Sequence, residues 1–157
     1  MIIELSVLGE PMGKQRPRAT FVAGHATIYT PKKTQGYEAR FASAYGEKYP
    51  NEEPIQGAIK VTISAFFSLS KADFNSRGEP NKKGTAKLQN ETMPTKKPDC
   101  DNIAKAVLDG LNGVAFQDDS QVVALSIAKN YSLRPRVEVQ IEPVAVPVKP
   151  FTVAVSR

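Results

Sequence analysis

The chain has 157 residues, of which 41% are hydrophobic and 24% charged, a composition that is typical of one globular domain and argues against wholesale disorder. The net charge of +5 suits a polyanionic partner without requiring one, and no apolar run approaches the ~20 residues that span a membrane. A single cysteine excludes an internal disulfide and a multi-cysteine zinc site, and a single histidine argues against a Ser-His-Asp or Cys-His enzyme. Any enzymatic chemistry is therefore expected to depend on carboxylates.

The first half of the chain predicts, in order, a strand over 2–8, a loop over 9–17, a short hairpin over 21–29 and a helix over 31–48. The helix is indicated by Tyr37, Phe41 and Tyr45, which recur at a spacing of four residues. Pro31 suits the start of this helix, and Gly24 suits the turn of the hairpin.

The second half predicts a strand over 58–68, a long loop over 71–97, a helix over 101–112 and strands over 121–131 and 137–141. Continuous apolar character predicts a largely buried strand over 121–131, and the short connection predicts that it pairs with 137–141 as a hairpin. The long loop is rich in Gly, Pro, Asn and Lys, with short helical fragments expected at 72–74 and 87–88. The tail over 143–157 contains three prolines and predicts an extended arm or an edge strand.

Charge is unevenly distributed along the chain. Two basic segments, 14–33 and 71–97, precede a stretch between Asp99 and Asp119 in which five acids face one base, Lys105. Basic segments suit DNA phosphates, which the acidic stretch would repel unless a cation lay between them. The residues expected to bind DNA are Lys14, Arg16, Arg18, Lys32, Lys33, Lys96 and Lys97.

The acidic stretch contains a candidate metal site. Asp99 and Asp101 lie at a helix start, and Asp118 and Asp119 lie at the entry to the next strand. Because the connection between helix and strand is short, we expect these carboxylates to converge. A divalent cation would then relieve their repulsion, and ligands that are all oxygen favour Mg²⁺ or Mn²⁺ over zinc. Lys105, four residues after Asp101, is expected to project beside the metal.

Structural explanations for the same residues stay open. Asp99 and Asp101 could be helix caps, and Lys105 could form surface ion pairs with Asp101 or Asp109. The residues 118–120 could form an ordinary turn. The bases and aromatics between Arg16 and Lys33 could stack on nucleobases, or they could belong to a solvated hairpin.

The motifs DCDNIAK, at 99–105, and FQDDSQV, at 116–122, resemble the RusA family of Holliday-junction resolvases. The resemblance covers about residues 1–142 and leaves 143–157 as a C-terminal extension. It implies an α+β single domain, with a mixed β-sheet packed against two helices, that forms a homodimer.

The resemblance also implies a function. Asp99, Asp101 and Asp119 would hold Mg²⁺, for which Mn²⁺ could substitute, and Lys105 would neutralise charge in the transition state. Two symmetric nicks would resolve four-way branched DNA and leave 5′-phosphate and 3′-hydroxyl ends, in the cytoplasm of a bacterial cell, with the protein encoded by the bacterium or by a prophage. Rival hypotheses are a non-catalytic basic module that binds branched or single-stranded DNA, and a nuclease that acts on flaps or forks.

Overall fold

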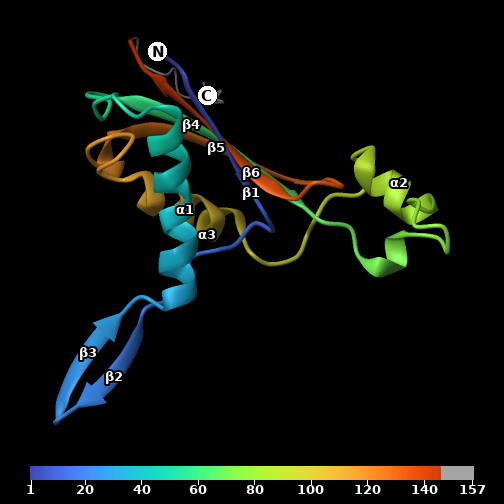
Figure 1. Cartoon of the computed structure of the whole chain (residues 1–157), viewed down its shortest axis with the longest axis horizontal. Helices are drawn as coiled ribbons and strands as arrows, with labels where there is room; N and C mark the ends of the chain where they lie inside the picture. Colours follow the sequence, from blue (N-terminus) through green and yellow to red (C-terminus); the bar gives the residue numbers. More distant parts are fainter. Residues whose placement is uncertain (146–157) are drawn as a thin grey trace, which may run out of the picture.

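A computed structural model describes residues 1–145 of the chain (Figure 1). Its elements are β1 (Ile3–Leu8), β2 (Arg18–Val22), β3 (His25–Tyr29), α1 (Lys32–Lys48), β4 (Ile59–Phe67), the 3₁₀ turn η1 (Lys71–Asp73), α2 (Lys82–Leu88), α3 (Cys100–Leu111), the 3₁₀ turn η2 (Asp119–Gln121), β5 (Val122–Tyr131) and β6 (Arg136–Pro143). The expected arm or edge strand over 143–157 lies outside the described residues from 146 onward.

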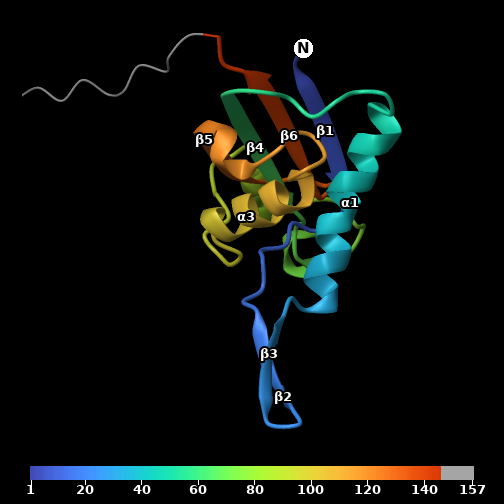
Figure 2. The same ribbon diagram turned by 90° about the vertical axis from the view of Figure 1, so that its left-hand side faces the viewer.

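Four strands form one mixed sheet in the order β1-β6-β4-β5, in which only β4 and β5 run parallel. Alternate residues of β1, β4 and β6 are buried, so one face of the sheet supplies the core. Figure 2 shows α1 and α3 on the same side of this sheet. The expected α+β class with a mixed sheet is therefore confirmed.

Helices α1 and α3 pack closely against each other because a glycine lies at their contact. A Cβ atom added to Gly110 of α3 would lie 2.6 Å from the carbonyl oxygen of Glu38 in α1. Tyr37, Phe41 and Tyr45 of α1 are buried, as their spacing predicted, and Ile103 and the other apolar residues of α3 complete the core. This packing fixes the position of α3, whose two ends carry the acidic motifs.

Two parts of the chain project from this body in different directions (Figure 1). Strands β2 and β3 form a separate two-stranded hairpin, here called the β2–β3 arm, at the place where the sequence predicted a hairpin. Residues 70–91, which include η1 and α2, form the second projection, here called the η1–α2 lobe. No helix in the described part of the chain is both long and apolar enough to cross a membrane.

The prediction that residues 121–131 pair with 137–141 as a hairpin is wrong. β6 lies between β1 and β4, and β5 pairs with the other edge of β4. The alternating apolar residues of β4 are all fully buried, so β4 takes a central place and separates the two later strands. β5 is consequently an edge strand, and Val123 and Leu125 are exposed rather than buried.

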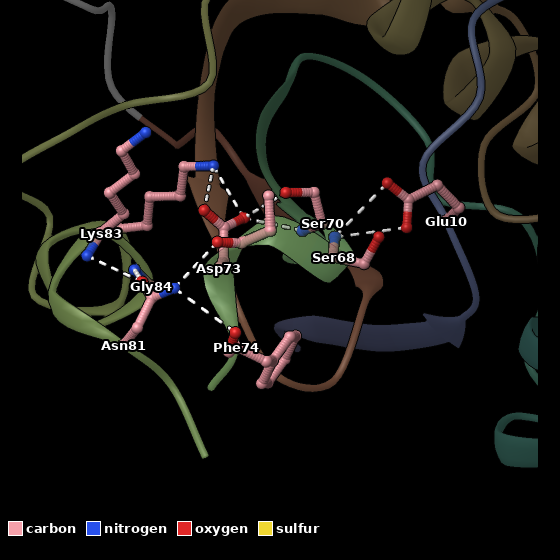
Figure 3. A network of polar contacts seen from close by, with 10 residues as sticks. Glu10, Ser68, Ser70, Asp73, Phe74, Asn81, Lys83 and Gly84 are labelled. Carbon is pink, nitrogen blue, oxygen red and sulfur yellow. Dashed lines mark hydrogen bonds and ion pairs between the residues drawn. The ribbon is translucent and has the colours of Figure 1, made fainter. Parts of the chain in front are cut away.

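The stretch over 71–97 is also more ordered than an irregular loop. Asp73, at the end of η1, is 2% exposed and pairs with Lys87 of α2 at 2.8 Å. Figure 3 shows the surrounding network, in which Asn81 caps α2 by accepting hydrogen bonds from the Lys83 and Gly84 amides. The helical fragment expected at 72–74 overlaps η1, and the one expected at 87–88 is the last part of α2.

Candidate active site

The carboxylates of Asp99 and Asp101 lie at the amino-terminal end of α3. Asp99 occupies the N-cap position, yet its side chain makes no capping hydrogen bond. Its nearest basic group is Lys97, whose Nζ lies 3.9 Å away and whose side chain is 89% exposed. Asp101, in the first turn, is exposed. The helix-cap explanation therefore accounts for the position of Asp99 but not for its carboxylate.

Lys105 lies one turn further along α3 and is exposed. Within residues 1–145 it forms no ion pair with Asp101 or with Asp109, although both lie four residues away. Asp109 instead pairs with Lys14. Lys105 and Asn102 line a cavity of about 240 Å³ together with Lys14, Arg16 and Thr30. Lys105 is thus available to a ligand beside the two carboxylates.

The loop over 9–17 is fixed against α3 by its glycine and its first lysine. A Cβ atom on Gly13 would lie 2.9 Å from Cβ of Pro98 and 3.0 Å from Cβ of Asn102, so only glycine fits without displacement. The Lys14 amide donates to the Asn102 carbonyl at 3.1 Å. This contact sets the basic loop directly over the amino-terminal end of α3.

The side chain of Lys14, which the sequence analysis assigned to DNA binding, faces internal carboxylates. Its Nζ lies 3.2 Å from Glu38 and also contacts Asp109. Burial alone would lower the pKa of Lys14, but the hydrogen bonds to Asp109 and Glu38 outweigh it, and its pKa is raised. Lys14 therefore stays charged and ties the loop to both helices, which leaves Arg16 as the next base that faces outward.

The other bases assigned to DNA binding lie on both sides of this end of α3. Arg18 begins β2, and Lys32 and Lys33 form the first turn of α1; all three are exposed. Lys96 and Lys97 directly precede α3 and are also exposed. Sequence reasoning missed Lys129 of β5, which donates to the Lys96 carbonyl. No local signal indicates Lys129, because only the folded chain brings its side chain to the segment before α3, 33 positions earlier.

The second acidic motif has one structural aspartate and one free aspartate. Asp118 forms a capping box with Gln121, and its side chain accepts from the Ser120 amide at 3.3 Å. Hydrogen bonds from the Ser120 side chain and amide lower the pKa of Asp118. Asp119 is exposed and forms no ion pair within residues 1–145. The turn explanation therefore holds for Asp118 and not for Asp119.

The expectation that the carboxylates converge within one chain is wrong. The Gly113 amide donates to the Phe116 carbonyl at 2.8 Å and Asn112 forms a β-bridge with Phe116, which keeps the second motif at the carboxy-terminal end of α3. The 12 residues of α3 rise by ~18 Å, so this end is far from Asp99 and Asp101. No group of three His, Cys, Asp or Glu side chains within residues 1–145 is arranged to hold a metal ion. The connection is short, as expected, but it brings the strand start to the opposite end of the helix.

The profile of the family described as endodeoxyribonuclease RusA matches residues 9–142 of the chain. A relative from Bacillus subtilis (strain 168), named as the uncharacterized protein YqaN, is 34% identical over 143 residues, which make up 91% of this chain and 97% of the relative. The chain belongs to the RusA endodeoxyribonuclease family, as its two acidic motifs indicated. Membership defines an enzyme class that cuts DNA internally and acts on Holliday junctions.

Proposed function

We propose that the chain is a divalent-metal-dependent endonuclease that resolves four-way DNA junctions as a homodimer. The observation that carries this proposal is the exposed set of Asp99, Asp101 and Lys105 at one end of α3. Within residues 1–145, Asp101 and Lys105 form no ion pair, and Asp99 has only the highly exposed Lys97 at 3.9 Å. The exposed bases Lys96 and Lys97 precede this helix end, and Arg16 lines the same cavity as Lys105. Exposed carboxylates beside a polyanion binding surface are unfavourable unless a cation joins them. Structural roles do not account for these three side chains.

The donor set suits Mg²⁺ or Mn²⁺ when two copies of the chain contribute to one site. Asp99 and Asp101 supply adjacent carboxylate oxygens, which hard cations prefer. Asp119 is the natural third ligand, but α3 holds it at the opposite end of the helix. A second copy related by a two-fold axis would bring its Asp119 to the Asp99 and Asp101 of the first. Such a dimer has two equivalent sites, as paired symmetric nicks require.

Each residue then has a distinct part in phosphodiester hydrolysis. Asp99 and Asp101, with Asp119 of a second copy, would hold Mg²⁺, which would supply an activated water and offset the charge on the scissile phosphate. Lys105 orients that phosphate and neutralises charge that develops on its oxygens. Arg16, Lys32 and Lys33 hold the backbone of the adjacent DNA arm. Attack that releases the 3′ oxygen leaves 5′-phosphate and 3′-hydroxyl ends, and the reaction serves recombination and repair in the cytoplasm.

Incubation of an end-labelled four-way junction with the full chain tests this function. We expect paired nicks at symmetric positions in Mg²⁺ or Mn²⁺ and binding without cutting in EDTA. Ligation of the nicked products without prior treatment reports a 5′-phosphate and a 3′-hydroxyl. Junction binding without any metal-dependent cleavage would contradict the proposal and favour the non-catalytic module. Equal cutting of flaps and replication forks would instead show a broader nuclease.

A further inference from the structure

The β2–β3 arm is a hairpin without a core of its own. Every residue of both strands is exposed, and Ala23 (φ 51°) and Gly24 (φ 82°) form a two-residue turn of the kind that closes twisted hairpins. An isolated two-stranded hairpin is marginally stable in water, so a surface of this kind is expected to gain stability from a partner. The question is which partner suits its two faces.

The strand register divides the arm into two chemically different faces. Directly opposed residues share a face, and Ala19 opposes Ile28 while Phe21 opposes Ala26. This face is entirely apolar, with Phe21 77% and Ile28 74% exposed. On the other face, Arg18 opposes Tyr29, and the remaining opposed pairs are Thr20 with Thr27 and Val22 with His25. The arm therefore presents an apolar wedge backed by a mixed face, in which Arg18 lies beside threonines, His25, Val22 and Tyr29.

Charge identifies the partner as nucleic acid. Between Glu10 and Glu38 the chain has no acidic residue, and its bases include Arg16, Arg18 and Lys33. Both ends of the arm start at the candidate active site, because Arg16 and Thr30 line the same cavity as Lys105. A DNA strand whose phosphate contacts Lys105 therefore passes the base of the arm. Five strand residues extend ~17 Å, about the length of five stacked base pairs.

We infer that the β2–β3 arm opens the branch point of the junction: Phe21 and Ile28 stack on a base pair at the crossover, and the face that carries Arg18 follows the phosphates. This inference rests on the proposed function. Apolar side chains can be inserted between base pairs where unstacking is least costly, and a branch point has base pairs that lack a continuous neighbour. A continuous duplex offers the arm no such surface. The arm would thus contribute to preference for junctions over duplexes.

A binding measurement in EDTA separates this inference from catalysis. The substrates are a four-way junction with 2-aminopurine at the crossover and a linear duplex of the same sequence. Wild-type protein should increase the 2-aminopurine fluorescence and prefer the junction. The double variant Phe21→Ala/Ile28→Ala should lose the fluorescence increase and roughly tenfold of the junction-over-duplex preference. Its Tm should not change, because the arm is exposed throughout.

The matched control is Ile2→Ala, which shortens another exposed apolar side chain (51% exposed) next to the N-terminus, away from the arm (Figure 1). It should behave as wild type in both measurements. Unchanged fluorescence and preference in the double variant would overturn the inference. Loss of the dimer in the double variant would also overturn it, because the apolar face would then cover a second copy. Failure of the wild-type protein to cut in Mg²⁺ would refute the proposed function, and the EDTA result would still decide the role of the arm.

Discussion

The η1–α2 lobe and the first turns of α3 both place an aspartate near a lysine, but within residues 1–145 Asp73 pairs with Lys87 whereas Asp101 does not pair with Lys105. Asp73 is 2% exposed and accepts hydrogen bonds from Lys87 at 2.8 and 2.9 Å and from the Ser70 hydroxyl at 2.8 Å. At α3, Asp101 and Lys105 are exposed and do not pair with each other within the described residues. One combination stabilises structure, and the other is available to a ligand.

The difference also shows what spacing alone leaves open. Asp101 and Lys105 have the four-residue helical spacing that favours an ion pair, whereas Asp73 and Lys87 are 14 residues apart. Lys87 reaches Asp73 because α2 folds back on η1, with Gly84 so close to the Asp73 carbonyl that a Cβ would lie 2.4 Å from it. Lys87 also lies 4.9 Å from the ring centre of Tyr131. The contacts that a carboxylate makes in the folded chain, rather than its sequence spacing from a lysine, show whether it has a structural or a chemical role.

The largest expected effect is that of Asp101→Asn on cleavage. This change removes a ligand charge, so the single-turnover rate on a four-way junction in Mg²⁺ should fall by on the order of 10³-fold. Junction affinity in EDTA should be kept or increased, and Tm should not change because the side chain is exposed and forms no ion pair within residues 1–145. Glu53→Gln, an exposed acid in the 51–56 turn region, is the neutral control. Wild-type cleavage by Asp101→Asn would contradict the assignment.

Lys105→Ala should reduce the cleavage rate by on the order of 10²-fold, because one charge that stabilises the transition state is lost. Affinity for the junction should change much less, as other bases hold the DNA backbone. Lys105→Arg keeps the charge and should recover part of the rate. A variant that loses only thermal stability would show instead that Lys105 is a structural residue.

Asp73→Asn should have the opposite profile. Removing one partner of a buried ion pair should destabilise the η1–α2 lobe by about 2 kcal/mol, measured by hydrogen exchange of its amides. Cleavage at a temperature at which the lobe stays folded should be close to wild type. Glu91→Gln changes an exposed acid after α2 and should leave exchange unchanged. Lost cleavage with normal exchange would place Asp73 in the chemistry and break the contrast between the two regions.

The same pair predicts how lobe stability depends on pH. Hydrogen bonds from Lys87, together with those from Ser70, lower the pKa of Asp73 to about 2 from 3.8. As pH falls, the Asp73 carboxyl is protonated in the unfolded lobe before it is protonated in the folded lobe. The contribution of the Asp73–Lys87 pair to lobe stability is therefore complete above about pH 4 and is lost as pH falls toward 2. Hydrogen exchange at matched intrinsic rates should show this loss in wild type and not in Asp73→Asn. An identical pH dependence in both proteins would contradict the role of the pair.

The smallest expected effect is that of Asp118→Ala. Asp118 caps η2 at the surface, so its loss should lower the free energy of unfolding by less than the change expected for the lobe in Asp73→Asn. The measurement is a small fall in Tm. Cleavage should fall only because loss of the cap loosens the turn that contains Asp119. Asp118→Asn can still accept hydrogen bonds, so it should keep most of the wild-type cleavage rate. A loss of cleavage as large as that of Asp101→Asn would show that Asp118 itself contacts the metal or the DNA.

Local patterns predicted the parts of this fold that local forces determine. The spacing of Tyr37, Phe41 and Tyr45 gave α1, and Gly24 marked the turn of the arm. Strand order could not be read in this way, because the position of β4 between β5 and β6 depends on burial across the whole sheet. The D-x-D motif was correctly placed at a helix start for the same local reasons.

The site was predicted only in part because its distances depend on tertiary geometry. Sequence spacing showed that the connection from α3 to β5 is short, but not which end of α3 it follows. Likewise, nothing around Lys14 indicated that Glu38 and Asp109 would occupy its charge, since both lie on helices that meet only in the folded chain. Both aspartates are exposed, and the hydrogen bonds that Asp118 accepts from Ser120 in the capping box, which only the structure reveals, separate it from Asp119.

The most direct test of the central claim is a mixing experiment with two inactive variants. Asp101→Asn and Asp119→Asn, unfolded and refolded together, form mixed dimers in which one shared site is doubly altered and the other is intact. We expect each variant alone to be inactive and the mixture to recover up to about a quarter of the wild-type sites, with single nicks in place of paired ones. A mixture as inactive as its components would show that no intact site is restored by a second copy, and would contradict the account.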